Sequence, residues 1–113
     1  MGIVFEIREY VEDRRSPFRE WFDRLDPVTA ARVDRYIRRL EAGNFGAAKS
    51  FPTGLYELRL NFGPGYRVYY GLAGKTVIIL LGGGDKRRQD ADIAAATERW
   101  RRYKEITHHG SDK

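Results

Sequence analysis

Alternation between apolar and polar side chains predicts several β-strands along this chain. Apolar residues recur at every second position over residues 3–8, and the same period of two returns over residues 55–62 and 66–72. Such a period is typical of a strand that buries one face. Residues 76–81 are apolar almost throughout, as expected of a strand that is covered on both faces. The pattern therefore predicts one early strand and three later ones.

Three other stretches place apolar side chains at helical spacing, and two of them carry clear start signals. In each, a capping residue precedes a proline at the first helical position, at Ser16-Pro17 and at Asp26-Pro27. Gly43 is expected to end the second helix, and Asp90 to begin the last one. The predicted order is strand, helix, helix, three strands, helix.

Length and composition narrow the possible roles of the chain. With 113 residues it forms one domain, predicted here to span residues 1–106, followed by a disordered tail over residues 107–113. The chain contains no cysteine, and it has neither a long apolar run nor a signal peptide, so we expect a cytoplasmic protein that does not enter a membrane. The net charge is +5, and 16 of the 21 basic residues are arginine. This charge favours a polyanionic partner, either nucleic acid or an acidic protein.

The hairpin formed by the second and third strands predicts a polar surface. Both apolar rows face one core only if even-numbered residues pair with even-numbered ones. A three-residue turn at 63–65 meets this condition and sets Asn61 opposite Arg67 and Arg59 opposite Tyr69. Because Arg67 is then off the core face, its replacement by alanine should leave the fold intact. The polar face would carry Glu57, Arg59, Asn61, Arg67 and Tyr69.

This surface has chemistry suited to the cleavage of RNA. Attack of a 2′-hydroxyl on the adjacent phosphate needs a proton acceptor, a proton donor and cations around the phosphorus. Arginines supply the cations, and the basic segment at residues 85–88 follows the last strand. No motif for a metal or another cofactor is recognised, and His108 and His109 lie in the predicted tail. Acid and base duties are therefore assigned to Lys86 or Tyr69.

Several short motifs together resemble the addiction-module killer branch of the RelE/HigB/ParE toxin superfamily. The most extended matches are Gly63-Pro64-Gly65-Tyr66-Arg67-Val68-Tyr69 and Gly83-Gly84-Asp85-Lys86, with Glu57-Leu58-Arg59, Gln89 and Asp92-Ile93 around them. The resemblance covers about residues 3–105. It implies a RelE-like α+β fold of order β-α-α-β-β-β-α, in which a helical hairpin and a C-terminal helix pack on a small antiparallel sheet.

The resemblance also implies a function and roles for individual residues. It implies a toxin of a type II toxin-antitoxin system that cleaves mRNA on the ribosome without a metal, and that is neutralised by an antitoxin of the helix-turn-helix type. Arg59 and Arg67 would hold the scissile phosphate, with Lys86 acting from the following loop. The expected RNA-binding residues are Lys49, Asn61, Arg87 and Arg88. Position 93, where RelE-type toxins carry a tyrosine, is isoleucine, so the resemblance does not identify the general base.

Two alternatives remain open from the sequence. A ParE-like protein would keep the fold but inhibit DNA gyrase by binding, without catalysis. A basic nucleic-acid-binding module would use the arginines between Arg32 and Arg39 to contact phosphates. That helix face could equally be solvated or contact an acidic antitoxin.

Overall fold

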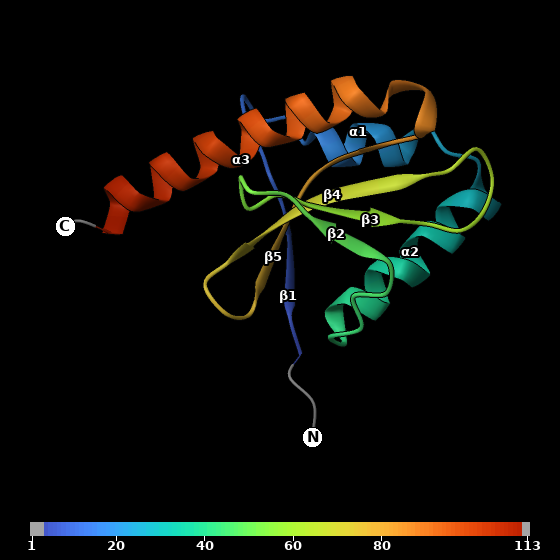
Figure 1. Ribbon diagram of the computed structural model, residues 1–113, viewed down its shortest axis with the longest axis horizontal. Coiled ribbons are helices and arrows are strands. Elements are labelled where there is room, and N and C mark those ends of the chain that lie inside the picture. Colours follow the sequence, from blue (N-terminus) through green and yellow to red (C-terminus); the bar gives the residue numbers. More distant parts are fainter. Residues whose placement is uncertain (1–3, 112–113) are drawn as a thin grey trace.

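Five strands form one mixed sheet in the order β1-β5-β4-β3-β2 in the computed structural model, which describes residues 4–111 (Figure 1). The strands are β1 (Glu6–Glu9), β2 (Ala48–Ser50), β3 (Tyr56–Arg59), β4 (Arg67–Ala73) and β5 (Val77–Gly84). The helices are α1 (Pro17–Asp23), α2 (Pro27–Glu41) and α3 (Gln89–Ser111), and a short 3-10 turn, η1 (Lys86–Arg88), precedes α3. The predicted α+β class and the order of its main elements are confirmed.

Two strands differ from the sequence-based expectation. β1 pairs parallel with β5, whereas the resemblance implied an antiparallel sheet. Ile3 of the predicted first strand is outside the described residues. β2 adds an antiparallel edge strand between α2 and β3, where the predicted order contains no strand. Alternation reports which face a residue takes, but it carries no information on strand direction.

The two helix starts predicted from a capping residue and a proline are confirmed, and the last helix begins at Gln89, one residue before the predicted Asp90. The Ser16 hydroxyl accepts a hydrogen bond from the Arg19 N–H at 3.0 Å, and the Asp26 carboxylate accepts one from the Thr29 N–H at 3.2 Å. These bonds satisfy N–H groups that have no partner within the helix. Gly43 follows the end of α2 with a positive φ of 85°.

The predicted register of the β3–β4 hairpin is wrong by two residues. Even residues do pair with even ones, as Leu58 with Val68, but Arg59 lies opposite Arg67 instead of Tyr69. The connecting loop is wider than a three-residue turn, because the last hydrogen bond across it joins the Leu60 N–H to the Tyr66 carbonyl. A slip of two residues keeps every side chain on its face, so alternation alone could not detect it.

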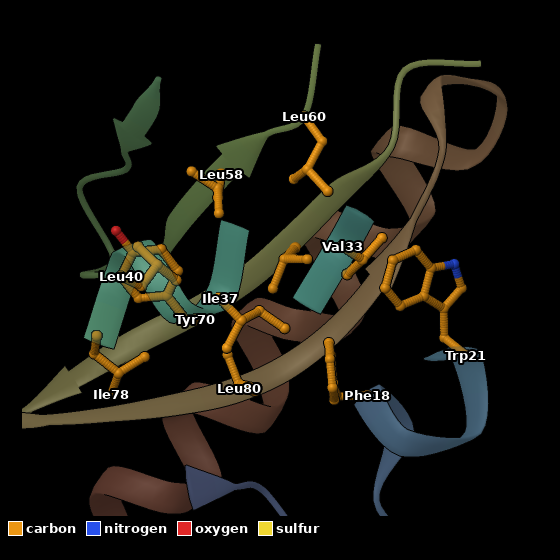
Figure 2. Packing of buried hydrophobic residues seen from close by; sticks show 11 residues of the cluster. Phe18, Trp21, Val33, Ile37, Leu40, Leu58, Leu60, Tyr70, Ile78 and Leu80 are labelled. Atoms are coloured by element: carbon orange, nitrogen blue, oxygen red, sulfur yellow. The ribbon is translucent and has the colours of Figure 1, made fainter. Parts of the chain in front are cut away.

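Two apolar clusters cover the two faces of the sheet. The larger lies between the sheet and the α1–α2 pair, where Phe18 and Trp21 of α1 approach Val33 and Leu80 (Figure 2). The smaller lies under α3 and includes Leu55, Tyr69, Ile79, Leu81 and Trp100. β5 contributes to both clusters, which confirms the prediction of a strand covered on both sides.

The long helix α3 reaches beyond the sheet. It begins next to the end of β5, and its last turns extend away from the strands (Figure 1). The helix continues to Ser111, past residue 106, where the sequence placed the end of the domain, and residues 112–113 are outside the described range. At its other end, the first turns of α3 lie over the face of the sheet that carries the polar residues of β3 and β4.

Candidate active site

A buried carboxylate lies at the centre of the polar cluster. Glu57 of β3 is 0% exposed. Its Oε2 accepts hydrogen bonds from the Tyr69 hydroxyl at 3.2 Å and from the Gln89 side-chain amide at 3.0 Å. Glu57 therefore ties β3 to β4 and to the first residue of α3.

Two arginines flank this carboxylate from the same face of the sheet. The Arg59 Nε lies 3.6 Å from Glu57 Oε1, and the Arg67 Nε lies 3.6 Å from Glu57 Oε2. Both contacts are ionic and too long for hydrogen bonds, and they leave Oε1 of Glu57 and Nε of Arg67 without a hydrogen-bond partner. Two like charges placed directly opposite in a sheet repel each other, and the carboxylate between them offsets this repulsion.

The two arginines differ in exposure. The Arg59 side chain is 51% exposed, whereas that of Arg67 is 9% exposed. The expectation that Arg67 lies on an open surface, so that alanine would leave the fold intact, is therefore corrected. The face is covered by the first turns of α3, and its polar residues border the second apolar cluster.

The Gly63-Pro64-Gly65 turn brings Lys86 to this cluster. Arg67 Nη1 donates a hydrogen bond to the Gly65 carbonyl at 2.7 Å, and the Lys86 N–H donates to the Pro64 carbonyl at 3.4 Å. Gly65 has a φ of +79°, and a Cβ built on it would lie 3.2 Å from Arg67 Nη1 and 3.4 Å from the Lys86 Cβ. Lys86 is exposed, and its Cβ and Arg67 Nη1 are both close to this position beside Gly65.

Lys49 extends the cluster to the edge of the sheet. It lies directly opposite Glu57 on β2, so the two residues share a face. Its side chain is exposed, with Nζ 5.2 Å from the centre of the Phe51 ring. Lys49, Arg59 and Arg67 therefore lie on one face of the sheet.

The other predicted RNA-binding residues take different places. Arg87 is highly exposed and forms an ion pair with Asp85 at 3.0 Å, and Arg88 follows it in η1. Asn61 lies in the loop between β3 and β4, past the end of the paired strands, so it is not opposite Arg67 as predicted.

Tyr69 is not accessible in the way that the sequence suggested. It is 1% exposed, and its hydroxyl donates to Glu57. Burial first, and then the negative charge of Glu57, raise the pKa of the Tyr69 hydroxyl well above its usual range. In this arrangement Tyr69 holds Glu57 in place.

A polar groove lies next to this cluster, between the end of β5, α1 and the start of α3. Its volume is about 330 Å³. The ring of Tyr66 and the carboxylate of Asp92 line it, together with Arg24, Arg87 and Arg88. Asp92 and Gln89 belong to the sequence motifs and Glu57 to the predicted polar face, but the sequence assigned no role to any of the three. The signal available for Glu57 was its position two residues before Arg59, on the same strand face.

Within residues 4–111, no group of three or more histidine, aspartate or glutamate side chains is arranged to hold a metal ion. No helix in the described part of the chain is both long and apolar enough to cross a membrane.

Comparison with known proteins identifies relatives. Residues 20–104 match a family described as "Phage derived protein Gp49-like (DUF891)". An uncharacterized protein from Haemophilus influenzae is 45% identical over 80 residues, which cover 70% of this chain and 81% of that protein.

Proposed function

Because the chain belongs to the Gp49-like family of phage-derived proteins, a family within the addiction-module toxins, we propose that it is an endoribonuclease of the RelE/HigB type. It would cleave mRNA on the ribosome and so inhibit translation. The main support is the position of Arg59 directly opposite Arg67, with the Gly65 turn next to both Arg67 and Lys86.

This arrangement suits a reaction at a phosphodiester. Negative charge accumulates on the phosphate oxygens during attack, and fixed cations that are already in place stabilise it. Arg59 is half exposed and can meet a phosphate, while Arg67 sets the position of the Gly65 turn. Glu57 restrains both guanidinium groups, so they need little reorganisation when the substrate binds.

Lys86 is the proton donor in this proposal. It is exposed and follows β5 directly, and the hydrogen bond from its N–H to Pro64 positions its backbone. An ammonium group carries three protons and can give one to the departing 5′-oxygen. The cations of the site supply the charge stabilisation, so the proposed reaction uses neither a metal nor another cofactor.

The exposed cations around the site would hold the RNA backbone. Lys49 lies on one side of the Glu57 cluster, and Arg87 and Arg88 lie on the other. Contacts of this kind are electrostatic and independent of sequence. Ribosomal RNA and mRNA provide such a polyanionic surface, in keeping with the net charge of +5.

The family implies a cognate antitoxin as partner. We propose that this antitoxin is of the helix-turn-helix type and that both proteins act in the cytoplasm. A short neighbouring gene that encodes such a protein would support the pairing.

Primer extension on cellular mRNA after a short pulse of expression tests the proposed activity. Wild-type protein should produce new 5′ ends within translated regions, and Arg59→Ala should reduce them at equal protein levels. Arg8→Ala is the matched control, because Arg8 is also a half-exposed strand arginine paired with a glutamate. Arg8 lies on the edge strand β1, which two strands separate from β3. Absence of new ends together with a DNA-damage response would overturn the proposal in favour of gyrase inhibition.

A further inference from the structure

We propose that Asp92 is the proton acceptor of this site and that the groove beside it receives the ribose whose 2′-hydroxyl attacks. This inference rests on the proposed nuclease function and supplies the group that the predicted residues leave unassigned. It comes from the positions of Asp92, Gly84 and Arg67.

Asp92 lies against the end of β5 in a space that only glycine leaves open. A Cβ built on Gly84 would be 2.0 Å from Asp92 Oδ2, so any side chain at position 84 would displace the carboxylate. Gly84 is the cross-strand partner of Arg67. Since Cβ positions of directly opposite residues are about 5 Å apart, the Asp92 Oδ2 lies on the order of 3–7 Å from the Arg67 Cβ.

The resulting row crosses three strands at one level of the sheet. Arg59 on β3 lies opposite Arg67 on β4, which lies opposite Gly84 on β5, and the Asp92 carboxylate covers that glycine. Next to the row, the Lys86 Cβ and Arg67 Nη1 both lie within 4 Å of a Cβ built on Gly65. The row therefore places two cations and a carboxylate on three adjacent strands, within roughly 10 Å, which is two strand spacings.

Asp92 is also available to a substrate. It lines the groove of about 330 Å³, a volume at the lower end of that found for small-molecule sites. Its carboxylate forms no hydrogen bond or ion pair with any other side chain in the described part of the chain. Burial raises its pKa above the usual aspartate range, which makes it a better proton acceptor than an exposed aspartate.

Charged groups from several elements surround Asp92. Arg88 of η1 and Arg99 of α3 lower its pKa, and Asp85 raises it, but burial has the largest effect. Arg24 of α1 and Arg87 of η1 also line the groove, and Tyr69 of β4 is near enough for the charge of Asp92 to affect its pKa.

The other candidates are already committed to protein contacts. Glu57 is fully buried between two arginines. Tyr69 donates its only hydroxyl proton to Glu57. Asp85 accepts from the Arg87 N–H at 2.9 Å and pairs with the Arg87 guanidinium, which holds its pKa below the usual range.

The proposed step conserves atoms and protons. The Asp92 carboxylate takes the proton of the 2′-hydroxyl, and the 2′-oxygen forms a bond to phosphorus. The bond from phosphorus to the 5′-oxygen breaks, and Lys86 gives its proton to that oxygen. The products are a 2′,3′-cyclic phosphate and a 5′-hydroxyl end.

Single-turnover cleavage of mRNA on programmed ribosomes, followed from about pH 4 to 8.5, tests the role of Asp92. Wild-type rates should rise with pH and then level off, because the carboxylate must lose its proton to act as a base. Asp92→Asn should lower the rate about 10²–10⁴-fold and remove this rise, with binding to the programmed ribosome unchanged. Asp90→Asn is the matched control, since it removes the same charge from an exposed position two residues earlier and should keep the wild-type rate.

The outcomes separate this inference from the proposed function. If wild-type protein cleaves and a folded Asp92→Asn protein cleaves at a similar rate, or cleaves slowly but keeps the rise with pH, Asp92 is not the base and the nuclease proposal stands. If wild-type protein fails to cleave mRNA on the ribosome, the proposed function and the role of Asp92 both fail. Arg59→Ala provides a further contrast, because it should lower the rate at every pH and preserve the shape of the profile.

Discussion

Arg67 and Glu57 form a buried ion pair on neighbouring strands, with the guanidinium Nε 3.6 Å from the carboxylate Oε2. Glu57 is 0% exposed and Arg67 is 8% exposed. The pair lies under the first residue of α3, where Gln89 donates to the same carboxylate oxygen. The same contacts of Glu57 therefore stabilise the fold and fix the position of Arg67.

Arg67→Ala should lower the free energy of unfolding by about 3–5 kcal/mol, because it leaves a buried carboxylate without its buried cation. Urea unfolding followed by tryptophan fluorescence measures this change. Arg59→Ala is the control and should cost at most about 1 kcal/mol, since that arginine is half exposed. Equal losses for the two variants would contradict the buried pair. Glu57→Gln combined with Arg67→Met should recover part of the loss.

Gly83→Ala should destabilise the fold through a clash with Trp21. A Cβ on Gly83 would lie 2.2 Å from Trp21 Cε3, inside the larger apolar cluster. We expect a loss of about 1–3 kcal/mol in the free energy of unfolding. Trp21→Leu opens this space, so the double variant should lose less than the sum of the two single losses.

Gly74→Ala provides the comparison for that experiment. A Cβ there has nothing within 4 Å, and the cost comes from its φ of +64°, at about 1–2 kcal/mol. Its effect should add to that of Trp21→Leu. If the losses of Gly83→Ala and Trp21→Leu were also additive in their double variant, the predicted clash would be absent.

Alkaline pH should destabilise the protein through its buried tyrosines. Burial first, and then the neighbouring Tyr56, raise the pKa of the Tyr70 hydroxyl well above the value of about 10 that it has when unfolded. Above pH 10 the unfolded state therefore releases a proton that the folded state keeps, and stability falls by up to about 1.4 kcal/mol per pH unit for each such group. Urea unfolding between pH 9 and 11 should show a shallower fall for Tyr70→Phe than for wild type. Identical slopes would contradict the raised pKa.

Lys86→Arg should separate charge from proton donation. A guanidinium keeps the positive charge but does not release its proton under these conditions. The variant should bind programmed ribosomes like wild type, yet cleave mRNA about 10²–10⁴-fold more slowly. Lys75→Arg is the control, because it makes the same change at an exposed turn between β4 and β5. Cleavage by Lys86→Arg at the wild-type rate would exclude Lys86 as the donor.

Much of the fold follows from local sequence. The pairs Ser16-Pro17 and Asp26-Pro27 define helix starts through bonds that form within three residues. Alternation assigned each residue of β3 and β4 to the correct face. The period of two was therefore enough to place Glu57, Arg59 and Arg67 on one surface.

The site itself depended on contacts between distant segments. Arg59 meets Arg67 because the hairpin loop is wider than its glycines suggest, and a shift of two residues leaves the apolar pattern unchanged. The polar face is buried because α3 packs over it. This packing cannot be predicted from the sequence of the strands alone.

The sequence by itself therefore determined the helix starts, the strand faces and the basic character of this protein, because each depends on residues that are close along the chain. Only the tertiary structure decided that β1 runs parallel to β5, that Glu57 is fully buried and that Asp92 lies over Gly84. These three features arise where segments far apart in sequence pack together. Their free energy depends on shape and burial across the whole domain, which no local pattern reports.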